Sequence, residues 1–173
     1  MERFSTIEEY ILSNKFNSEQ IQEIQIGYNH NIDYNKYAIP KLNYKQMEQY
    51  RIALEHNIDL FSYLEYDLDE NKLEQVRLAE EDRTSLKDYL SFSANQMEEI
   101  RLGLKHRISV DKYAFYFFNS NQMKQIRLGL EKNIDVSIYS DICFNHLQMK
   151  EIRLGLEEGL DINRYKDNFT YDQ

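Results

Sequence analysis

Residues 126–130 read Ile-Arg-Leu-Gly-Leu, and the same five residues recur at 100–104 and 152–156. Looser copies stand at 24–28 (IQIGY), 50–54 (YRIAL) and 76–80 (VRLAE). Successive copies are 26 residues apart, except for 24 between the third and the fourth. A fixed period of this length is typical of repeat proteins. The sequence therefore predicts six tandem units.

A helix-start signal precedes every copy. A short polar residue that can cap a helix follows a hydrophobic residue, and in five of the six units a Gln stands three residues further on. This pattern predicts a capping box and a hydrophobic staple at the start of a long helix. The caps are Asn17, Asn43, Asp69, Ser93, Asn119 and Asn145, and the staple residues are Phe16, Leu42, Leu68, Phe92, Phe118 and Phe144.

Each long helix is expected to run for about fourteen residues and to end in a left-handed residue. The expected end positions are Asn31, Asn57, Arg83, Arg107, Asn133 and Gly159. A second cap follows two residues later, and a tyrosine always stands four residues after that cap. We interpret this segment as a second helix of one to two turns. Its tyrosines are Tyr37, Tyr63, Tyr89, Tyr113, Tyr139 and Tyr165.

These signals predict an all-α fold without a sheet, as a right- or left-handed α-solenoid-like array of six repeats, each a long helix plus a short one. One domain would span 1–173, with an N-terminal cap at 1–15 and the start of a truncated seventh unit at 169–173. The recurrent mid-helix glycine is expected to admit another helix at close range. The repeats lie at about 16–41, 42–67, 68–91, 92–117, 118–143 and 144–168.

The units at 122–139 and 148–165 carry the pattern QMxxIRLGLExxIDVxxY most closely. This pattern resembles a tandem helical repeat of low-GC Gram-positive bacteria and their mobile elements. The resemblance covers residues 16–173 and implies an architecture but no activity. The third unit departs most, with Lys72 in place of the Gln, Glu80 in an apolar position and two residues lost between Tyr89 and Phe92.

Composition narrows the classes of function. The formal net charge of −9 argues against direct binding to nucleic acid or to an anionic membrane, and favours a basic partner. The longest wholly apolar run, 113–118, is far shorter than a membrane helix. A single cysteine, Cys143, and a start without a signal-peptide pattern predict a cytoplasmic protein.

Three rows of repeated residues could be functional or structural. The arginines Arg51, Arg77, Arg101, Arg127 and Arg153 could grip phosphates, but four of them have a Glu four residues later, which favours ion pairs. The tyrosines could form a stacking track, but a residue present in every repeat is more often core. His30, His56 and His106 share one position, where a solvated role is favoured over a metal site. The sequence predicts no catalytic motif, no metal and no cofactor.

The departures from the repeat are more informative about function. Residues 65–82 contain eight acids and two bases, and the two-residue deletion follows them. The fourth unit then carries three additional aromatic residues. Acids beside aromatics are typical of a binding hot spot, although the aromatics could also fill space left by the shortened loop. The candidate partner-binding residues are Glu65, Asp67, Asp69, Glu70, Glu74, Glu81, Asp82, Phe115, Tyr116 and Phe117.

The leading hypothesis is a non-enzymatic protein-binding repeat module that uses this acidic and aromatic surface. One alternative is an acidic inhibitor that mimics nucleic acid and acts on a host defence protein or another nucleic-acid-binding protein, as a phage or mobile-element anti-defence factor. A second alternative is a self-associating structural array. The sequence leaves the partner's identity and the oligomeric state open.

Overall fold

The computed structural model describes residues 6–161, and all regular structure in this range is helical. The longer helices are α1 (Ile7–Asn14), α2 (Ser18–Asn29), α4 (Tyr44–Glu55), α5 (Glu70–Glu81), α6 (Ala94–Lys105), α7 (Ser120–Glu131) and α8 (His146–Glu157). The short elements are α3 (Tyr34–Tyr37), η1 (Phe61–Tyr66), η2 (Lys87–Tyr89), η3 (Val110–Lys112) and η4 (Val136–Ile138). The predicted all-α class without strands is confirmed for the described residues.

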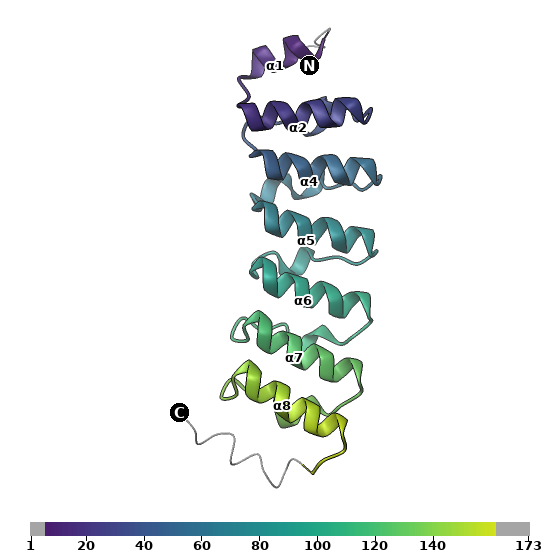
Figure 1. The fold of residues 1–173 in the computed structure, drawn as a ribbon, viewed down its shortest axis with the longest axis vertical. Coiled ribbons are helices and arrows are strands. Elements are labelled where there is room, and N and C mark those ends of the chain that lie inside the picture. Colours follow the sequence, from purple (N-terminus) through teal and green to yellow (C-terminus); the bar gives the residue numbers. More distant parts are fainter. Residues whose placement is uncertain (1–5, 162–173) are drawn as a thin grey trace. The chain divides into compact units, whose positions relative to one another are not determined.

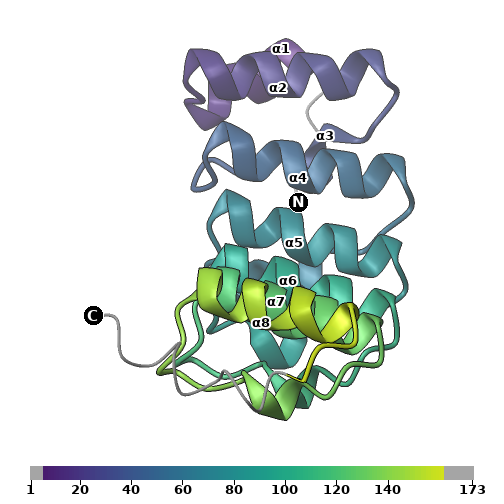
Figure 2. The same cartoon turned by 60° about the horizontal axis from the view of Figure 1, so that its bottom comes forward.

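The chain divides into two compact halves. We call residues 1–81 the N-terminal half and residues 82–173 the C-terminal half. In the N-terminal half α2 packs against α4 and α4 against α5, and both ribbon views show these helices side by side (Figures 1 and 2). In the C-terminal half α6 packs against α7 and α7 against α8. Each half thus contains a stack of three long helices that are joined through short helical turns.

The predicted helix starts are confirmed. Asn17, Asn43, Ser93, Asn119 and Asn145 each form a complete capping box with the Gln three residues later. Asp69 accepts from the backbone N–H of Lys72 at 2.9 Å, without the reciprocal Gln. All six staple residues are buried. At the N-terminal end, Thr6 caps α1, and Tyr10 of that helix is buried, as expected for a capping half-unit.

The long helices also end where the sequence predicts. Each helix has 12 residues rather than fourteen, and all six predicted end positions have positive φ, including Arg83 and Arg107. In five units the next residue donates its N–H to the carbonyl of the small helix residue, as Ile134 does to Gly129 at 3.0 Å. This is the Schellman arrangement, which satisfies carbonyls at the helix end.

In the first five units the second helix has one to two turns, as expected, but in four of them it is a 3₁₀ helix rather than an α-helix. It is a single α-turn in α3 and a 3₁₀ segment in η1 to η4. The predicted sixth second helix and the start of a seventh unit lie outside the described residues. Because a 3₁₀ turn has poor hydrogen-bond geometry, its place depends on the side chains it buries, above all the repeat tyrosine.

The glycines in the long helices admit a tyrosine rather than another helix, which corrects the expectation from sequence. A Cβ on Gly27, Gly103 or Gly129 would lie 1.9 Å from the hydroxyl of Tyr37, Tyr113 or Tyr139, respectively. Tyr37 is the last residue of α3, and Tyr113 and Tyr139 directly follow η3 and η4, so each tyrosine stands at the end of the short helix of its own unit. The absent side chain therefore opens the slot in which the tyrosine hydroxyl reaches the long helix.

The three tyrosines in these slots are fully buried. Their hydroxyls donate to backbone carbonyls four residues before the glycine, at 3.0 Å for Tyr37 to Glu23, 2.9 Å for Tyr113 to Glu99 and 3.1 Å for Tyr139 to Gln125. Burial raises the pKa of each phenol. The interpretation of these tyrosines as core residues is confirmed.

Units with alanine in place of the glycine treat their tyrosine differently. In the unit of Ala53, Tyr63 donates to the carboxylate of Glu80 in the next long helix, at 2.9 Å. In the unit of Ala79, Tyr89 is only half-buried. Glu80, the acidic residue that breaks the repeat, thus serves as an acceptor for the hydroxyl of Tyr63.

Candidate functional site

One segment of each unit varies in sequence between the repeat tyrosine and the next staple residue. These variable turns are residues 38–41, 64–67, 90–91, 114–117 and 140–143. In the fourth unit Phe115 donates its N–H to Tyr113 at 2.7 Å and Phe118 to Phe115 at 3.1 Å. The fifth unit has the same bonds, from Asp141 to Tyr139 and from Phe144 to Asp141. One backbone turn therefore presents different side chains in successive units.

The turn of the fourth unit presents three aromatic side chains to solvent. Phe115, Tyr116 and Phe117 are 42%, 66% and 60% exposed. The rings of Phe115 and Phe117 stack at 5.1 Å, and the ring of Phe117 meets buried Phe118 edge-on at 4.7 Å. Large aromatic surface held on a hydrogen-bonded turn is available to a partner at low conformational cost. We call Phe115, Tyr116 and Phe117 the aromatic turn.

The two-residue deletion shapes one side of the aromatic turn. Tyr116 stacks on Phe92 at a centroid distance of 4.2 Å, and its hydroxyl lies 2.5 Å from the hydroxyl of Ser91. The shortened turn at 90–91 therefore leaves room that Tyr116 covers. Tyr116 thus fills part of this space, as the structural alternative expects, while most of its side chain remains exposed.

Two acids outside the predicted site, Asp88 and Asp111, lie near Tyr89, whose ring neighbours Phe92. The ring of Tyr89 is 6.0 Å from that of Phe92, and its pKa is raised by burial and then by the charges of Asp88 and Asp111. Their signal in the sequence is weak, because single acids close to a repeat tyrosine look like ordinary surface residues. Residues 82–173 thus have two exposed acids of their own near the cluster of Tyr89 and Phe92.

The acids predicted from residues 65–81 belong to the N-terminal half, where several of them already have partners. Asp69 caps α5, Glu70 accepts from the side chain of Asn43 at 3.2 Å, and Glu81 binds Arg77 and His56. Glu65, Asp67 and Glu74 are exposed, and their carboxylates make no hydrogen bond or ion pair with any other described residue. Of the seven predicted acids, these three are the ones open to a partner.

Asp82, the remaining predicted acid, lies in the C-terminal half and forms ion pairs there. It binds Arg101 at 3.0 Å and Lys105 at 2.8 Å. Three other repeats have a His at the position of Asp82, and each of these His pairs with a Glu at the position of Lys105, as His106 does with Glu131. The charges of both members are exchanged together, so Asp82 preserves a structural contact and is a weak candidate for partner binding.

The arginines form ion pairs, as the spacing predicted, but they do more than the sequence indicated. Arg51, Arg77, Arg127 and Arg153 each bind the Glu four residues later. Each also donates its Nε to a buried side chain of the preceding long helix, as Arg127 does to Glu99 at 2.9 Å. Glu23, Gln49 and Gln125 accept in the same way from Arg51, Arg77 and Arg153. Each of these arginines therefore ties two consecutive long helices together.

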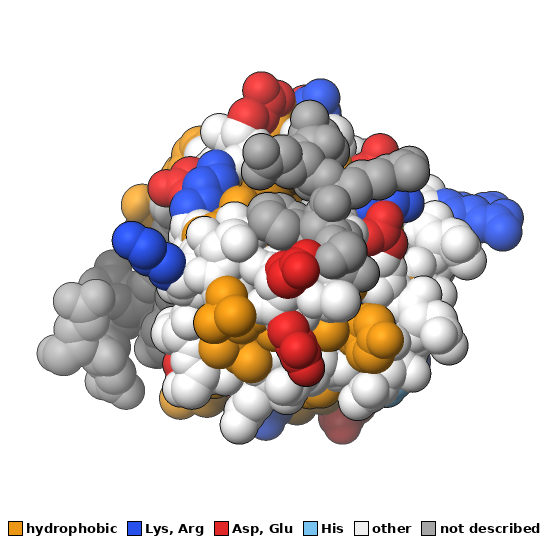
Figure 3. Space-filling model, turned by 90° about the horizontal axis from the view of Figure 1, so that it is seen from above, with side chains coloured by type: hydrophobic (Ala, Val, Ile, Leu, Met, Phe, Trp, Pro, Cys, Tyr) orange, Lys and Arg blue, Asp and Glu red, His pale blue; other side chains and the backbone are white. Residues whose placement is uncertain are grey.

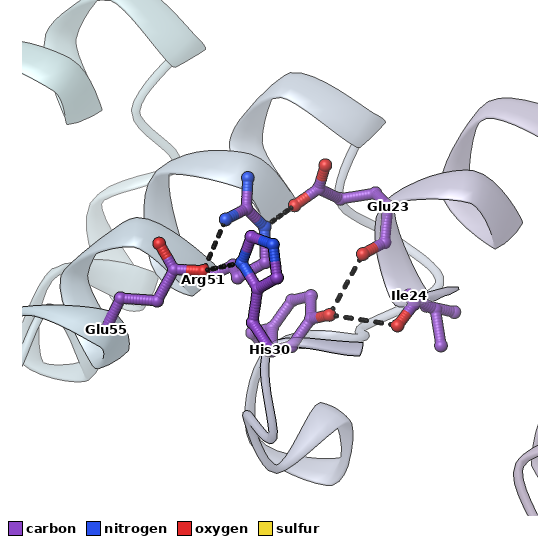
Figure 4. Close-up of polar contacts among 6 residues, drawn as sticks. Glu23, Ile24, His30, Arg51 and Glu55 are labelled. Atoms are coloured by element: carbon purple, nitrogen blue, oxygen red, sulfur yellow. Dashed lines mark hydrogen bonds and ion pairs between the residues drawn. The ribbon is translucent and has the colours of Figure 1, made fainter. Parts of the chain in front are cut away.

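Three histidines join this network of arginines and glutamates, as Figure 4 shows for His30. His30 and Arg51 both reach Glu55, while Arg51 also reaches Glu23. His56 and His106 bind Glu81 and Glu131 in the same way, at 2.7 and 2.8 Å. No group of three or more His, Cys, Asp or Glu side chains within residues 6–161 could hold a metal ion. The histidines are half-exposed members of an ion-pair ladder.

Burial and pairing oppose each other along this ladder. For Glu23 and Glu99 burial outweighs the paired arginine and raises the pKa of the carboxyl group. For Glu55 and Glu131 burial also acts to raise the pKa, but hydrogen bonds from a histidine and an arginine lower it below 4.5. The anionic forms of Glu55 and Glu131 are therefore stabilised, whereas burial makes the anionic forms of Glu23 and Glu99 less favourable.

We predict that the lowered pKa of Glu131 affects how the free energy of unfolding depends on pH in acid. A carboxyl group with a lowered pKa contributes stability that is complete above the unfolded value and is lost as pH falls through the folded one. The Glu131→Gln variant lacks this contribution, so its free energy of unfolding should fall less steeply than that of wild type below pH 4.5. Urea unfolding at several pH values between about 3 and 6 measures it. An equal slope in both proteins would count against the ion pair, and the exposed Glu98→Gln variant is the control.

Comparisons with protein-family models, with curated proteins and with solved structures found no match. Among the described residues no helix is long and apolar enough to cross a membrane. The case for a function therefore depends on the geometry of the aromatic turn and its surroundings.

Proposed function

We propose that this chain is a non-enzymatic protein-binding module, built as an α-solenoid-like array of six repeats and acting in the cytoplasm. Its principal contact is the aromatic turn, Phe115 to Phe117. The single observation that carries the proposal is the exposure of three neighbouring aromatic side chains on a turn whose backbone is the same in the next unit. Such residues are costly to leave in water and are typical anchors of protein interfaces.

The division of roles between positions supports the proposal. The repeated residues are occupied as caps, staples, buried tyrosines and ion-paired arginines. The variable turns carry no such duty, and side chains on a common backbone turn can change without cost to the array. In repeat proteins the variable loops often form the binding surface. The aromatic turn occupies the position of Asp141, Ile142 and Cys143 in the next unit.

The charge near the aromatic turn favours a basic partner. Asp88 and Asp111 lie near Tyr89, whose ring neighbours Phe92. An arginine or lysine side chain can stack on an aromatic face and meet a carboxylate at its edge. The bound segment is therefore expected to combine an apolar anchor for Phe117 with one or more cationic side chains.

A second candidate function is inhibition by mimicry of nucleic acid. It is favoured by the net charge of −9 and by the exposed acids Glu65, Asp67 and Glu74, which have no partner among the described residues. Binding through such acids would weaken steeply with salt, whereas binding through aromatic anchors would depend on salt only weakly. The self-associating array remains an alternative with no specific observation in its favour.

The test of the proposed function is affinity capture from the source cell with wild type and matched variants. A Tyr116→Ala, Phe117→Ala variant should lose its partner, with affinity lower by at least about tenfold. Ile142→Ala is the control, because Ile142 is 63% exposed and occupies the position of Tyr116 in the next unit. Unchanged circular dichroism and melting temperature would show that the variants fold.

A salt series and one charge variant separate the two candidates. If capture survives in 0.5 M salt (about three times the physiological ionic strength) but fails with the aromatic variant, the protein-binding module is supported. If capture falls steeply with salt and is abolished by reversing Glu65, Asp67 and Glu74, mimicry is supported instead. These three acids are preferable to Glu70 and Glu81, whose reversal would also break contacts with Asn43 and Arg77.

A further inference from the structure

A groove crosses the ends of two neighbouring long helices in the N-terminal half. The helices α2 and α4 pack side by side and end on the same edge of their stack (Figure 1). A hollow of about 540 Å³ lies at the end of α2, and a second hollow of about 850 Å³ lies between the turn after α2 and the turn after α4. Asp33 lines both hollows, so they adjoin. We call the two together the helix-end groove.

Three aromatic side chains line the helix-end groove. Tyr28 and Tyr34 border the smaller hollow, and Phe61 borders the larger one. Tyr28 is 55% exposed, whereas Phe61 is half-buried and its ring stacks on buried Tyr50 at 5.5 Å. The position of Phe61 is polar in the other five units, namely Asn35, Lys87, Asp111, Ser137 and Asn163. An aromatic residue at this position is therefore not a requirement of the repeat.

Two aspartates hold equivalent positions in the groove, one in each unit. Oδ1 of Asp33 accepts from the backbone N–H of Asn35 at 3.1 Å, and Oδ1 of Asp59 accepts from that of Phe61 at 2.9 Å. Both aspartates are exposed, and Oδ2 of each makes no hydrogen bond or ion pair with any residue in the range 6–161. The backbone contacts hold the carboxylates in place while one oxygen stays open. The groove therefore presents two positioned anions to a ligand.

The surrounding charge favours a cationic ligand. Residues 1–81 contain 16 acids and 8 bases, a formal charge of −8, whereas residues 82–173 contain 14 acids and 13 bases. Figure 3 looks onto the end of the molecule that carries α1, and in the middle of this view acidic side chains stand beside hydrophobic ones. One base, Lys36, lines the larger hollow together with the two aspartates. A positively charged ligand is therefore attracted to this half of the chain.

We propose that the helix-end groove binds a basic, proline-rich segment of a partner protein in the polyproline II conformation. Packed helices stand ~8–10 Å apart, so Asp33 and Asp59 should repeat at a similar distance. A polyproline II chain rises about 9 Å in three residues and then presents the same face again. Two cations three residues apart can therefore meet both aspartates, whereas residues three apart in a β-strand point to opposite faces.

The rest of the lining fits the backbone of such a segment. Aromatic-lined grooves bind proline-rich segments at low entropic cost, because the polyproline II helix is already formed. This helix makes no hydrogen bonds within itself, so its carbonyls accept from outside. Asn31 and Asn57 hold equivalent positions in the two units, line the groove and are exposed, and their amides can donate. The site goes beyond the proposed function, because it involves no residue of the aromatic turn.

The test uses the full chain and two fluorescent octapeptides that consist of proline and two arginines. The first probe has its arginines three residues apart, at its third and sixth positions. The second has the same composition and charge, but its arginines are two residues apart, at its third and fifth positions. Binding is measured by fluorescence anisotropy at physiological ionic strength. We expect saturable binding of the first probe and binding of the second that is weaker by at least about fivefold.

Three variants locate the site on the protein. Asp33→Asn combined with Asp59→Asn removes both charges but keeps both caps, because Asn and Asp cap equally well. This double variant should weaken binding of the first probe by at least about tenfold. Phe61→Ser should also weaken it, because the aromatic wall of the larger hollow is lost. Lys36→Ala should strengthen it, because a like charge is removed from the groove.

Two further variants are matched controls. A counterpart hollow of about 470 Å³ in the C-terminal half is lined by Asp135 and Leu156, and no aromatic side chain is among the described residues around it. Asp135→Asn removes one acid there and should leave probe binding unchanged. Tyr116→Ala in the aromatic turn should also leave it unchanged. The second control separates this site from the proposed function, because the two can then fail independently.

Four outcomes would overturn the helix-end groove as a binding site for this segment. One is the absence of saturable binding of the first probe to wild type. Another is equal binding of the two probes, since the spacing of the cations would then have no effect. A third is unchanged binding by the double aspartate variant while circular dichroism shows it to be folded. The last is equal binding of a probe with glycine in place of every proline, since the polyproline II conformation would then not be recognised.

Discussion

Replacing Arg127 with methionine is expected to lower the free energy of unfolding by about 3–5 kcal/mol. The guanidinium group binds Glu99 of α6 and Glu131 of its own helix, and both Arg127 and Glu99 are buried. Methionine fills similar volume but leaves the carboxylate of Glu99 buried without a cation. Because burial already raises the pKa of Glu99, the variant should take up a proton there more readily than wild type.

The structure supplies a matched control for this prediction. Arg153 has the same position, burial and outer partner, Glu157, but its inner partner is the neutral side chain of Gln125. Arg153→Met should therefore cost clearly less, and adding Glu99→Gln to Arg127→Met should recover much of the loss. Urea unfolding of the four proteins measures these differences. Equal losses for the two arginine variants would show that the buried charge at Glu99 is not what makes Arg127 important.

Replacing Gly103 with alanine should destabilise the chain by about 2 kcal/mol or more, although alanine is the better helix former. The new Cβ would lie 1.9 Å from the hydroxyl of Tyr113. The tyrosine must then leave its slot and give up its hydrogen bond to the carbonyl of Glu99. The measurement is the free energy of unfolding of the variant against wild type.

A second substitution tests the mechanism. Tyr113→Phe removes the atom that collides, and the nearest remaining atoms, from Val110 and the ring of Tyr113, are 3.0 and 3.1 Å from the added Cβ. The double variant should therefore be more stable than Gly103→Ala alone. Ala53→Gly is the control in a unit whose tyrosine does not occupy such a slot, and it should cost about 1 kcal/mol, as expected for a helix interior. A double variant no better than the single one would refute the slot.

The sequence predicts the local structure closely because its helix signals act over a few residues. The caps at Asn17 or Asn119 and the left-handed end at Asn133 depend only on neighbours along the chain, and they recur six times. The role of the glycines could not be read in this way. The contact between Gly129 and Tyr139 joins residues ten apart, and a glycine in a helix is equally consistent with a neighbouring helix.

The candidate site shows the same limit more strongly. The departure from the repeat at 115–117 identified exposed aromatics, because nothing in the repeat required them. Composition alone could not separate open acids from engaged ones. Glu74 and Glu81 look alike in the sequence, but Glu81 pairs with Arg77 and His56. Asp111 was missed because its relation to Tyr89 depends on how two turns meet in space, and Asp88 was missed because a single acid beside a repeat tyrosine looks like an ordinary surface residue.

The central claim is that binding is performed by the variable aromatic turn and not by the repeated residues. Photo-crosslinking in the source cell tests it most directly, with benzoylphenylalanine placed at position 117 in one protein and at position 142 in another. The account predicts one discrete crosslinked protein from position 117, which charge reversal of Asp88 and Asp111 diminishes, and none from position 142. A crosslink from position 142 with none from position 117 would contradict it.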